Sequence, residues 1–267
     1  MAAPRGVQFD GDVVRKHDDP AWLAVEVAKT RLAARVGEET GLFYVPRIVH
    51  FDAQAGDVAF ERIPDLLTNE QLATRHDPRL EEVVVRSGRA LAAVHSRLRL
   101  DDPLRIEMSP EWMIPGADCA FLHSDFAPAN VFLQEGTGRL VIIDWATGPY
   151  LDRNATFGPR YFELAWFVLG LYIAVPAKCF GPRSARRQAD AFLAAYLSQR
   201  SEALDADLFR RFQGPAWRLH FSGMGQRIRA RPWHRKVLYP PREFRNYAAF
   251  RLYRPGGAVP VGEGPPG

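Results

Sequence analysis

Polar residues stand at both ends of an apolar segment in the middle of the chain, Phe121–Ala146. The segment reads FLHSDFAPANVFLQEGTGRLVIIDWA, with Asp125 and Asn130 before the first apolar run and Asp144 after the second. Carboxylate and amide oxygens are the ligands that Mg²⁺ accepts from a protein that leaves its other positions to water and phosphate. A carboxylate is also a common general base. These residue types favour metal-dependent chemistry, although Asp and Asn also cap turns without any chemical role.

The two apolar runs predict a β-hairpin that would bring these oxygen atoms together. Its strands are expected over Val131–Gln134 and Leu140–Ile143, with a turn at 135–139. In the register that we expect, Asn130 directly faces Asp144. Directly opposed residues of an antiparallel pair lie about 4.5–5.5 Å apart at Cα, so the two side chains would converge. Asp125, in the preceding loop, would lie within reach of the same end of the hairpin.

Length and composition are those of an ordinary globular protein. The chain has 267 residues, of which 47% are hydrophobic and 25% charged, which allows one large domain or two lobes with a core. The longest apolar run, Leu164–Ala177, is too short for a membrane span and predicts a buried helix. No signal peptide is visible, so a cytoplasmic location is expected. Cys119 and Cys179 are expected to be buried, reduced thiols, not parts of a disulfide or metal site.

The first 64 residues predict a small unit of strands with one helix. VQFDGDVVRKH is typical of two strands joined by an Asp-Gly turn. A helix follows, with Pro20 near its start and its end between Gly37 and Gly41. Two more strands are expected on either side of a turn at 52–57.

Residues 65–254 predict a second, mainly helical unit. Helical patterns cover 79–98, 160–173 and 184–204, and the hairpin described above interrupts them. Residues 255–267 form a Gly/Pro-rich tail that is expected to be disordered. The expected class is therefore α+β.

The complete pattern His-x-Asp-x-x-x-x-Asn, a short hairpin and Ile-Asp-Trp resembles the catalytic and metal-binding segments of kinase-like phosphotransferases. The resemblance is strongest to the aminoglycoside phosphotransferase and choline kinase group, whose usual HGDLHPGN…IDW corresponds to HSDFAPAN…IDW here. VAFERIPD resembles the last strand and hinge of the N-terminal lobe of that group, and GRALAAVHS resembles the helix before its catalytic segment. The match covers most of residues 7–180. It implies a two-lobed, protein-kinase-like fold with a small, truncated β-sheet lobe and a larger helical lobe.

The resemblance also implies a reaction and the residues that perform it. The reaction is transfer of a phosphoryl group from ATP, with Mg²⁺, to a hydroxyl of a small molecule. Asp125 would be the catalytic base, and Asn130 and Asp144 would hold Mg²⁺. His123 would brace the loop and would not carry a proton.

Five residues are implied in ATP binding. Lys16, on the second strand of the first hairpin, would contact phosphate, and Glu26, on the following helix, would hold that lysine in place. The backbone around Glu61, Arg62 and Ile63 would meet the adenine. The plainer alternative is that Lys16 and Glu26 are solvated surface charges.

Two features depart from the pattern of this group. Only Gly6 and Gly11 precede Lys16, and Gly11 belongs to the Asp-Gly turn, so the Gly-rich hairpin that normally covers the phosphates is not evident. A different cover, a misplaced start codon or relaxed catalysis would each account for this. In addition, Glu163 stands where the group often has an aspartate that ties down the catalytic loop.

The C-terminal third is rich in arginine, and Glu243 is the only acid between Arg210 and Arg254. A site for a polycationic aminoglycoside should be acidic, so a sugar-like or anionic acceptor is expected instead. Aromatic residues interleave with these arginines, a mixture that is compatible with a nucleic-acid surface. Such aromatic residues usually belong to a core, however, and no nucleic-acid partner is expected. Two alternatives remain: a nucleotide-binding pseudokinase or regulatory module, and a basic nucleic-acid-associated protein. The acceptor, the choice between ATP and GTP, and the oligomeric state stay open.

Overall fold

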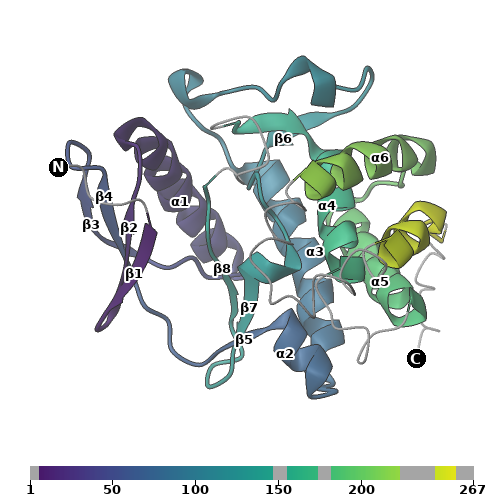
Figure 1. The fold of residues 1–267 in the computed structure, drawn as a ribbon, viewed down its shortest axis with the longest axis horizontal. Coiled ribbons are helices and arrows are strands. Elements are labelled where there is room, and N and C mark those ends of the chain that lie inside the picture. The colour runs from purple at the N-terminus through teal and green to yellow at the C-terminus, as the bar shows by residue number, and fades with distance from the viewer. Residues whose placement is uncertain (1–5, 147–154, 174–181, 223–243, 257–267) are drawn as a thin grey trace, which may run out of the picture.

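A computed structural model describes residues 6–146, 155–173, 182–222 and 244–256 of the chain. These residues form an N-terminal antiparallel sheet with one helix, followed by a larger, mostly helical region (Figure 1). The expected α+β class with a small N-terminal sheet is therefore confirmed. Within the described ranges, no helix is both long enough and apolar enough to cross a membrane.

The N-terminal sheet has four antiparallel strands in the order β1-β2-β4-β3. They are β1 (Gly6–Asp10), β2 (Val13–His17), β3 (Ile48–Asp52) and β4 (Asp57–Glu61). Both predicted hairpins are present, but the first turn is one residue later than expected. Asp10 pairs with Val13, so the loop consists of Gly11 and Asp12, and Gly11 adopts a φ of +56° that glycine tolerates without steric cost.

Helix α1 (Pro20–Thr40) has the predicted start and end. Its first residue is a proline, whose missing N–H costs nothing in the first turn of a helix. Gly41 ends it in a left-handed conformation and donates its N–H to the carbonyl of Gly37. Leu23 and Val27 of this helix pack on Val58 of β4 in a small core, while the C-terminal half of the helix joins the main core.

The helical region contains α2 (Asn69–Thr74), α3 (Arg79–Arg97), α4 (Arg160–Ile173), α5 (Pro182–Arg200), α6 (Ala206–Ser222) and a further helix over 244–252. The three predicted helices thus appear as α3, α4 and α5. All residues of α4 except Ile173 are buried, as its apolar sequence indicates. Helices α3 and α5 approach so closely at Gly88 that a side chain there would overlap the carbonyl oxygen of Phe192.

Short strands accompany these helices. β5 (Leu66–Thr68), β7 (Val131–Gln134) and β8 (Leu140–Ile142) form one small sheet, and β6 (Cys119–Phe121) pairs with β9 (Phe157–Pro159). The boundaries proposed after residues 64 and 254 stay predictions, and only residues 255–256 of the tail are described. Cys119 is a free but partly exposed thiol, so the expectation that it is buried was wrong; Cys179 lies outside the described residues.

The hairpin β7–β8 is present, but its predicted register was wrong by one residue. Val131 pairs with Ile142, so β8 ends before Ile143. The reason is a tighter turn: Gly138, with φ of +65°, donates its N–H to the carbonyl of Gln134 and closes the loop early. Residue 143 consequently donates its N–H to the carbonyl of Asn130, and the two predicted metal ligands are not directly opposed.

Candidate active site

Strand β2 and helix α1 place a lysine between two carboxylates. The Nζ atom of Lys16 lies 2.8 Å from Oε2 of Glu26 and 3.3 Å from Oδ1 of Asp144. Glu26 is buried, whereas the side chain of Asp144 is 47% exposed. Burial alone would lower the pKa of Lys16, but the two carboxylates outweigh it and raise that pKa above its ordinary value. Lys16 therefore stays charged and links the N-terminal sheet to the segment after β8.

Both carboxylate oxygens of Asp125, in the loop after β6, accept hydrogen bonds. Nε1 of Trp166 on α4 donates to Oδ1 at 2.8 Å, and Nδ2 of Asn130 donates to Oδ2 at 3.2 Å. Burial raises the pKa of Asp125 to about 6; the bond from Trp166 opposes this rise, and the charge of Asp144 adds to it. The carboxylate is held in one orientation with a pKa that suits a general base near neutral pH.

His123 is buried and connects the loop to the hairpin. Its Nδ1 accepts the N–H of Asp125 at 3.3 Å, so the ring proton resides on Nε2, which donates to the carbonyl of Ile143 at 3.1 Å. Burial lowers the pKa of His123 to about 4, which keeps the ring neutral. The ring also packs against Trp145, with 4.4 Å between centroids. These contacts are those of a brace.

Glu163 of α4 anchors the same loop from the other side. It is fully buried, and its Oε1 accepts the N–H of Ser124 at 2.6 Å. Its Oε2 accepts the N–H of His123 at 3.2 Å and lies 2.9 Å from Nε2 of His95. Burial would raise the pKa of Glu163, but His95 and the backbone donors outweigh it and lower the pKa. A glutamate thus ties down the loop, and the extra methylene relative to aspartate is accommodated.

The oxygen atoms predicted to hold Mg²⁺ fit that ion. Nδ2 of Asn130 donates to the backbone and side chain of Asp125, which leaves Oδ1 of Asn130 as the atom for a ligand. The exposed carboxylate of Asp144 supplies a second oxygen. Within the described ranges there is no group of three or more His, Cys, Asp or Glu residues able to hold a metal. One amide and one carboxylate suit Mg²⁺, because it commonly keeps several waters and binds substrate phosphates.

The predicted hinge begins where β4 ends. The carboxylate of Glu61 is occupied by the hydroxyl of Tyr44 and by the backbone and side chain of Arg47. The N–H of Arg62 donates to the carbonyl of Asp12, just before β2, and so extends the hydrogen-bond ladder between β2 and β4. In the part of the chain that the structure describes, no protein group accepts the N–H of Ile63. A backbone donor is therefore available at the hinge.

The face of the sheet that carries Lys16 also carries an apolar strip. Directly opposed residues share a face, so Val14 lies with Phe9 of β1 and Phe60 of β4 on the Lys16 side. Phe9 is 72% exposed, and the guanidinium of Arg62 lies over its ring, 5.7 Å from the centroid. The strip runs from the lysine toward the hinge and offers a surface for a planar aromatic group.

Two residues that hold the loop were not predicted from the sequence. One is Trp166, the donor to Asp125. The other is Asn69 at the start of α2, whose buried Nδ2 donates to the carbonyls of Pro128 and Val131 at 2.8 and 3.1 Å. Neither belongs to a pattern with a local chemical signature, because each reaches the loop from a distant part of the sequence.

Lys29 was also missed, although the sequence carries a signal for it. It lies on α1 three positions after Glu26, and its ammonium group is buried against the loop, 2.8 Å from the carbonyl oxygen of His123. Positions 26, 29 and 33 recur at helical spacing on one side of the helix. A lysine on that stripe indicates a specific buried partner.

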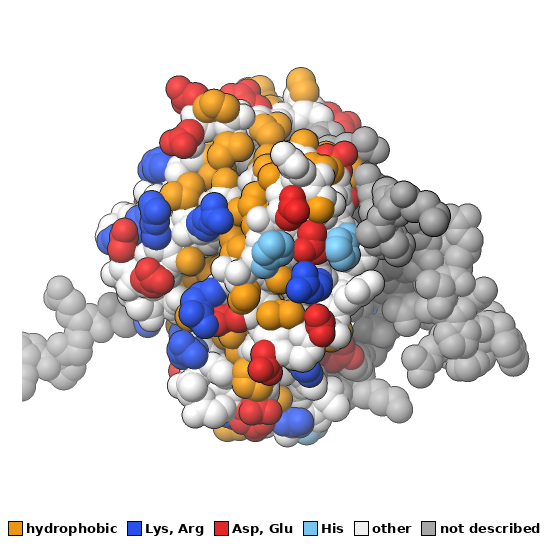
Figure 2. Space-filling view, turned by 90° about the vertical axis from the view of Figure 1, so that its left-hand side faces the viewer, with side chains coloured by type: hydrophobic (Ala, Val, Ile, Leu, Met, Phe, Trp, Pro, Cys, Tyr) orange, Lys and Arg blue, Asp and Glu red, His pale blue; other side chains and the backbone are white. Residues whose placement is uncertain are grey.

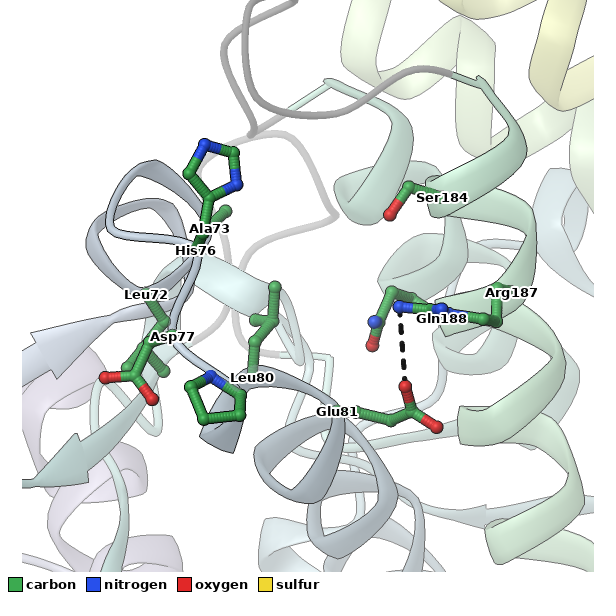
Figure 3. Close-up of a pocket in the computed structure, with 10 residues that line it drawn as sticks. Leu72, Ala73, His76, Asp77, Leu80, Glu81, Ser184, Arg187 and Gln188 are labelled. Carbon is green, nitrogen blue, oxygen red and sulfur yellow. Dashed lines mark ion pairs between the residues drawn. The ribbon is translucent and has the colours of Figure 1, made fainter.

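A cavity of about 370 Å³ lies elsewhere, between α2, α3 and α5 (Figure 3). Glu81 and Arg187 face each other across it and form an ion pair of 3.5 Å. None of the predicted site residues lines this cavity. It is therefore separate from the candidate active site.

The aromatic residues of the C-terminal third divide between core and surface. Trp217, Phe250 and Tyr253 are buried, whereas Phe221 and Phe244 are 40% and 55% exposed. The basic residues between 223 and 243 lie outside the described residues. Figure 2 views the molecule from the left-hand side of Figure 1, where the N-terminal sheet lies, and there positive, negative and apolar side chains are interspersed. Most of the described aromatic residues here thus serve packing.

Comparison with known proteins identifies the fold. No protein-family model and no curated protein sequence matches the chain. The amicoumacin kinase hAmiN, in complex with AMP-PNP, Ca²⁺ and Ami, shares 13% identity, covering 91% of this chain and 87% of its own, with a TM-score of 0.53. Aminoglycoside phosphotransferase APH(3'')-Id from Streptomyces rimosus, in complex with ADP and streptomycin, shares 16%, covering 76% and 85%, with a TM-score of 0.51. Choline kinase LicA from Streptococcus pneumoniae shares 15%, covering 92% and 88%, with a TM-score of 0.50.

These matches span most of each chain, and at such identities they show the fold. The chain has a protein-kinase-like fold. More closely, it is the version of that fold found in choline kinases and aminoglycoside phosphotransferases, as the HSDFAPAN…IDW pattern predicted.

Proposed function

We propose that this protein is a small-molecule kinase that transfers the γ-phosphoryl group of ATP to a hydroxyl. The observation that carries the proposal is the meeting of Lys16 and Glu26 with Asp144 beside the loop of Asp125. Lys16 and Asp144 are 128 positions apart in the chain. A lysine fixed between carboxylates next to an oriented base is the arrangement that phosphoryl transfer requires.

Each side chain has a role that follows from its surroundings. Asp125 would accept the proton of the acceptor hydroxyl, because its carboxylate is oriented by Trp166 and Asn130 and is ionised above about pH 6. Lys16 would contact phosphate oxygens with a charge that Glu26 holds in place. His123 would keep the loop in position.

Asn130 and Asp144 would hold Mg²⁺ through one oxygen each. When bound, the ion neutralises charge on the phosphates. The exposed carboxylate of Asp144 would face the ion, and Lys16 beside it would contact the phosphates. Two of the matched proteins are in complex with AMP-PNP or ADP, and one of these complexes contains Ca²⁺.

The adenine would lie on the apolar strip between Lys16 and the hinge. Val14, Phe9 and Phe60 supply apolar surface, and the backbone of Glu61, Arg62 and Ile63 borders it. The N–H of Ile63 would donate to the base. This arrangement needs no Gly-rich hairpin, although it covers the phosphates less completely than such a hairpin would.

We further propose a sugar-like or anionic acceptor. The described part of the C-terminal third keeps its excess of arginine, and a polycationic ligand would be repelled there. Neither a nucleic-acid partner nor a membrane anchor is part of the proposal. The cytoplasmic location stays a prediction.

A nucleotide-binding module without transferase activity is the second candidate. The observation that favours it is the composition of the β1–β2 hairpin, in which Gly6 and Gly11 are the only glycines. Such a module would bind Mg-ATP through the same residues and would release no phosphorylated product.

Melting with and without Mg-ATP tests both candidates together. At one hundred times Kd, nucleotide should stabilise the fold by about 2.7 kcal/mol. No shift at millimolar Mg-ATP would remove both candidates. A mass-based screen of metabolites with the wild type and Asp125→Ala then separates them: product with the wild type alone supports the kinase, and tight ATP binding without any product supports the module.

A further inference from the structure

Helix α1 carries two charged residues that face the site, one helical turn apart. Glu26 holds Lys16 at 2.8 Å, and Lys29 reaches past it to the loop that precedes Asp125. Residues three apart on a helix project from the same side. One rigid element therefore contacts both the residue proposed for phosphate binding and the loop proposed for proton transfer.

Lys29 is buried, with 1% of its surface exposed. Its ammonium group donates to the carbonyl oxygen of His123 at 2.8 Å and to Oγ of Ser124 at 3.0 Å. Among the described residues, no carboxylate pairs with it directly. Burying an ammonium group is costly, and its hydrogen bonds to the loop offset that cost only while helix and loop keep this contact.

Ser124 occupies an unfavourable backbone conformation. Its φ is +77°, in the left-handed region that costs an L-residue other than glycine energy. The resembling kinases usually have glycine here, where no such cost arises. The serine gains contacts in exchange: its hydroxyl donates to the carbonyl of Ala155 at 2.7 Å and accepts from Lys29.

The segment 123–124 is thus held from two sides by opposite charges. Glu163 of α4 accepts its two N–H groups, and Lys29 of α1 donates to its carbonyl and hydroxyl. The same two residues immediately precede the proposed base. A displacement of α1 would pull on this segment directly.

We propose that Lys29 is a positioning residue for phosphoryl transfer and that Ser124 is its matched acceptor. Together they fix α1 to the loop of Asp125, so that the helix orienting Lys16 and the loop presenting the base keep one relative position. The inference deepens the proposed kinase function and rests on it for its catalytic consequence. The physical link between helix and loop can be tested without any turnover.

Amide hydrogen exchange tests the link. In Lys29→Met, which keeps an unbranched side chain but lacks the ammonium group, peptides covering 121–127 should exchange about tenfold faster, while peptides covering strand β7 stay unchanged. Val36→Ala, a buried change on α1 away from the loop, is the matched control. In this variant, exchange in peptides covering 121–127 should not rise relative to exchange in peptides covering β7. Unchanged exchange at 121–127 in Lys29→Met, or an equal rise in both regions, would overturn the link.

Kinetics with an acceptor from the screen test the positioning role. Lys29→Met should lower kcat about 10- to 100-fold with KM for ATP within about threefold, and Lys29→Arg should recover much of the loss. Ser124→Ala keeps the strained backbone but loses the acceptor, and it should behave similarly. The double variant should be no slower than Lys29→Met alone, because the two residues act as one unit.

The outcomes separate this inference from the proposed function. A lysine that only stabilises the fold would lower Tm and leave kcat unchanged below the melting range, and that result would overturn the positioning role. Additive losses in the double variant would do the same. If the wild type neither binds Mg-ATP nor yields product, the kinase proposal fails, while the exchange experiment still decides whether Lys29 joins helix and loop.

Discussion

The two halves of the candidate site are built in opposite ways. The loop around Asp125 is enclosed: His123, Ser124 and Glu163 are buried, and each loop group has a defined hydrogen-bond partner. Strand β1, which pairs with the strand that carries Lys16, is exposed along its whole length, and Phe9 is 72% exposed. Burial and hydrogen bonds are thus concentrated around the oxygen atoms proposed to accept a proton and to hold a metal. The surface offered to a planar base is left open.

The largest expected effect falls on the enclosed half. Asp125→Ala should reduce phosphoryl transfer by about 10²- to 10⁴-fold, the range that a positioned general base contributes. The Kd for Mg-ATP, measured by calorimetry, should change little. Transfer that persists at wild-type rate in the variant would remove Asp125 from the reaction.

Loss of the loop anchor should be the next largest effect. Glu163→Ala strips the acceptor from two buried N–H groups and from His95, and should lower the free energy of unfolding by about 3 kcal/mol. Urea unfolding measures this. Glu163→Asp is the control: it keeps the charge with a shorter reach and should lose markedly less. A loss below about 1 kcal/mol in Glu163→Ala would contradict the anchoring role.

The buried lysine makes stability depend on pH in a defined direction. Burial lowers the pKa of Lys29 to about 8 from an ordinary 10.5, and the charges of Glu163, Glu26, Asp144 and Asp125 oppose that lowering. Because the unfolded state binds the proton more tightly, stability rises as pH increases between these two values. From pH 8 to 9.5 the wild type should gain on the order of 1.5 kcal/mol relative to Lys29→Met. A parallel pH dependence in the two proteins would contradict the lowered pKa.

A substitution on the exposed apolar strip should change the stability of the fold little and the affinity for Mg-ATP more clearly. Phe9→Ser should change the free energy of unfolding by less than about 0.5 kcal/mol, because the ring is mostly exposed. The Kd for Mg-ATP should rise about three- to tenfold if adenine lies on the apolar strip. Exposed Val49 on β3 offers the control, since Val49→Ser should leave nucleotide binding unchanged. Equal effects of the two changes would exclude the strip as the adenine surface.

The elements of the fold were largely predictable because their signals are local. Pro20 and Gly41 mark the ends of α1, and the apolar run that starts at Leu164 predicted the buried helix α4. The hairpin was predictable too, but not its register. That depended on how tightly the turn closes at Gly138, where a shift of one residue separates Asn130 from the position opposite Asp144. A turn is decided by a few hydrogen bonds, which the strand pattern does not encode.

By itself the sequence determined the class of fold and the chemical types gathered in its central segment. Spacing along the chain reports helices, strands and the order of acids and amides, since these depend on near neighbours. Only the tertiary structure decided which distant groups hold that segment in place. Lys29, Trp166 and Asn69 lie tens of residues from the loop they contact, and burial against it gives them partners that no local pattern specifies.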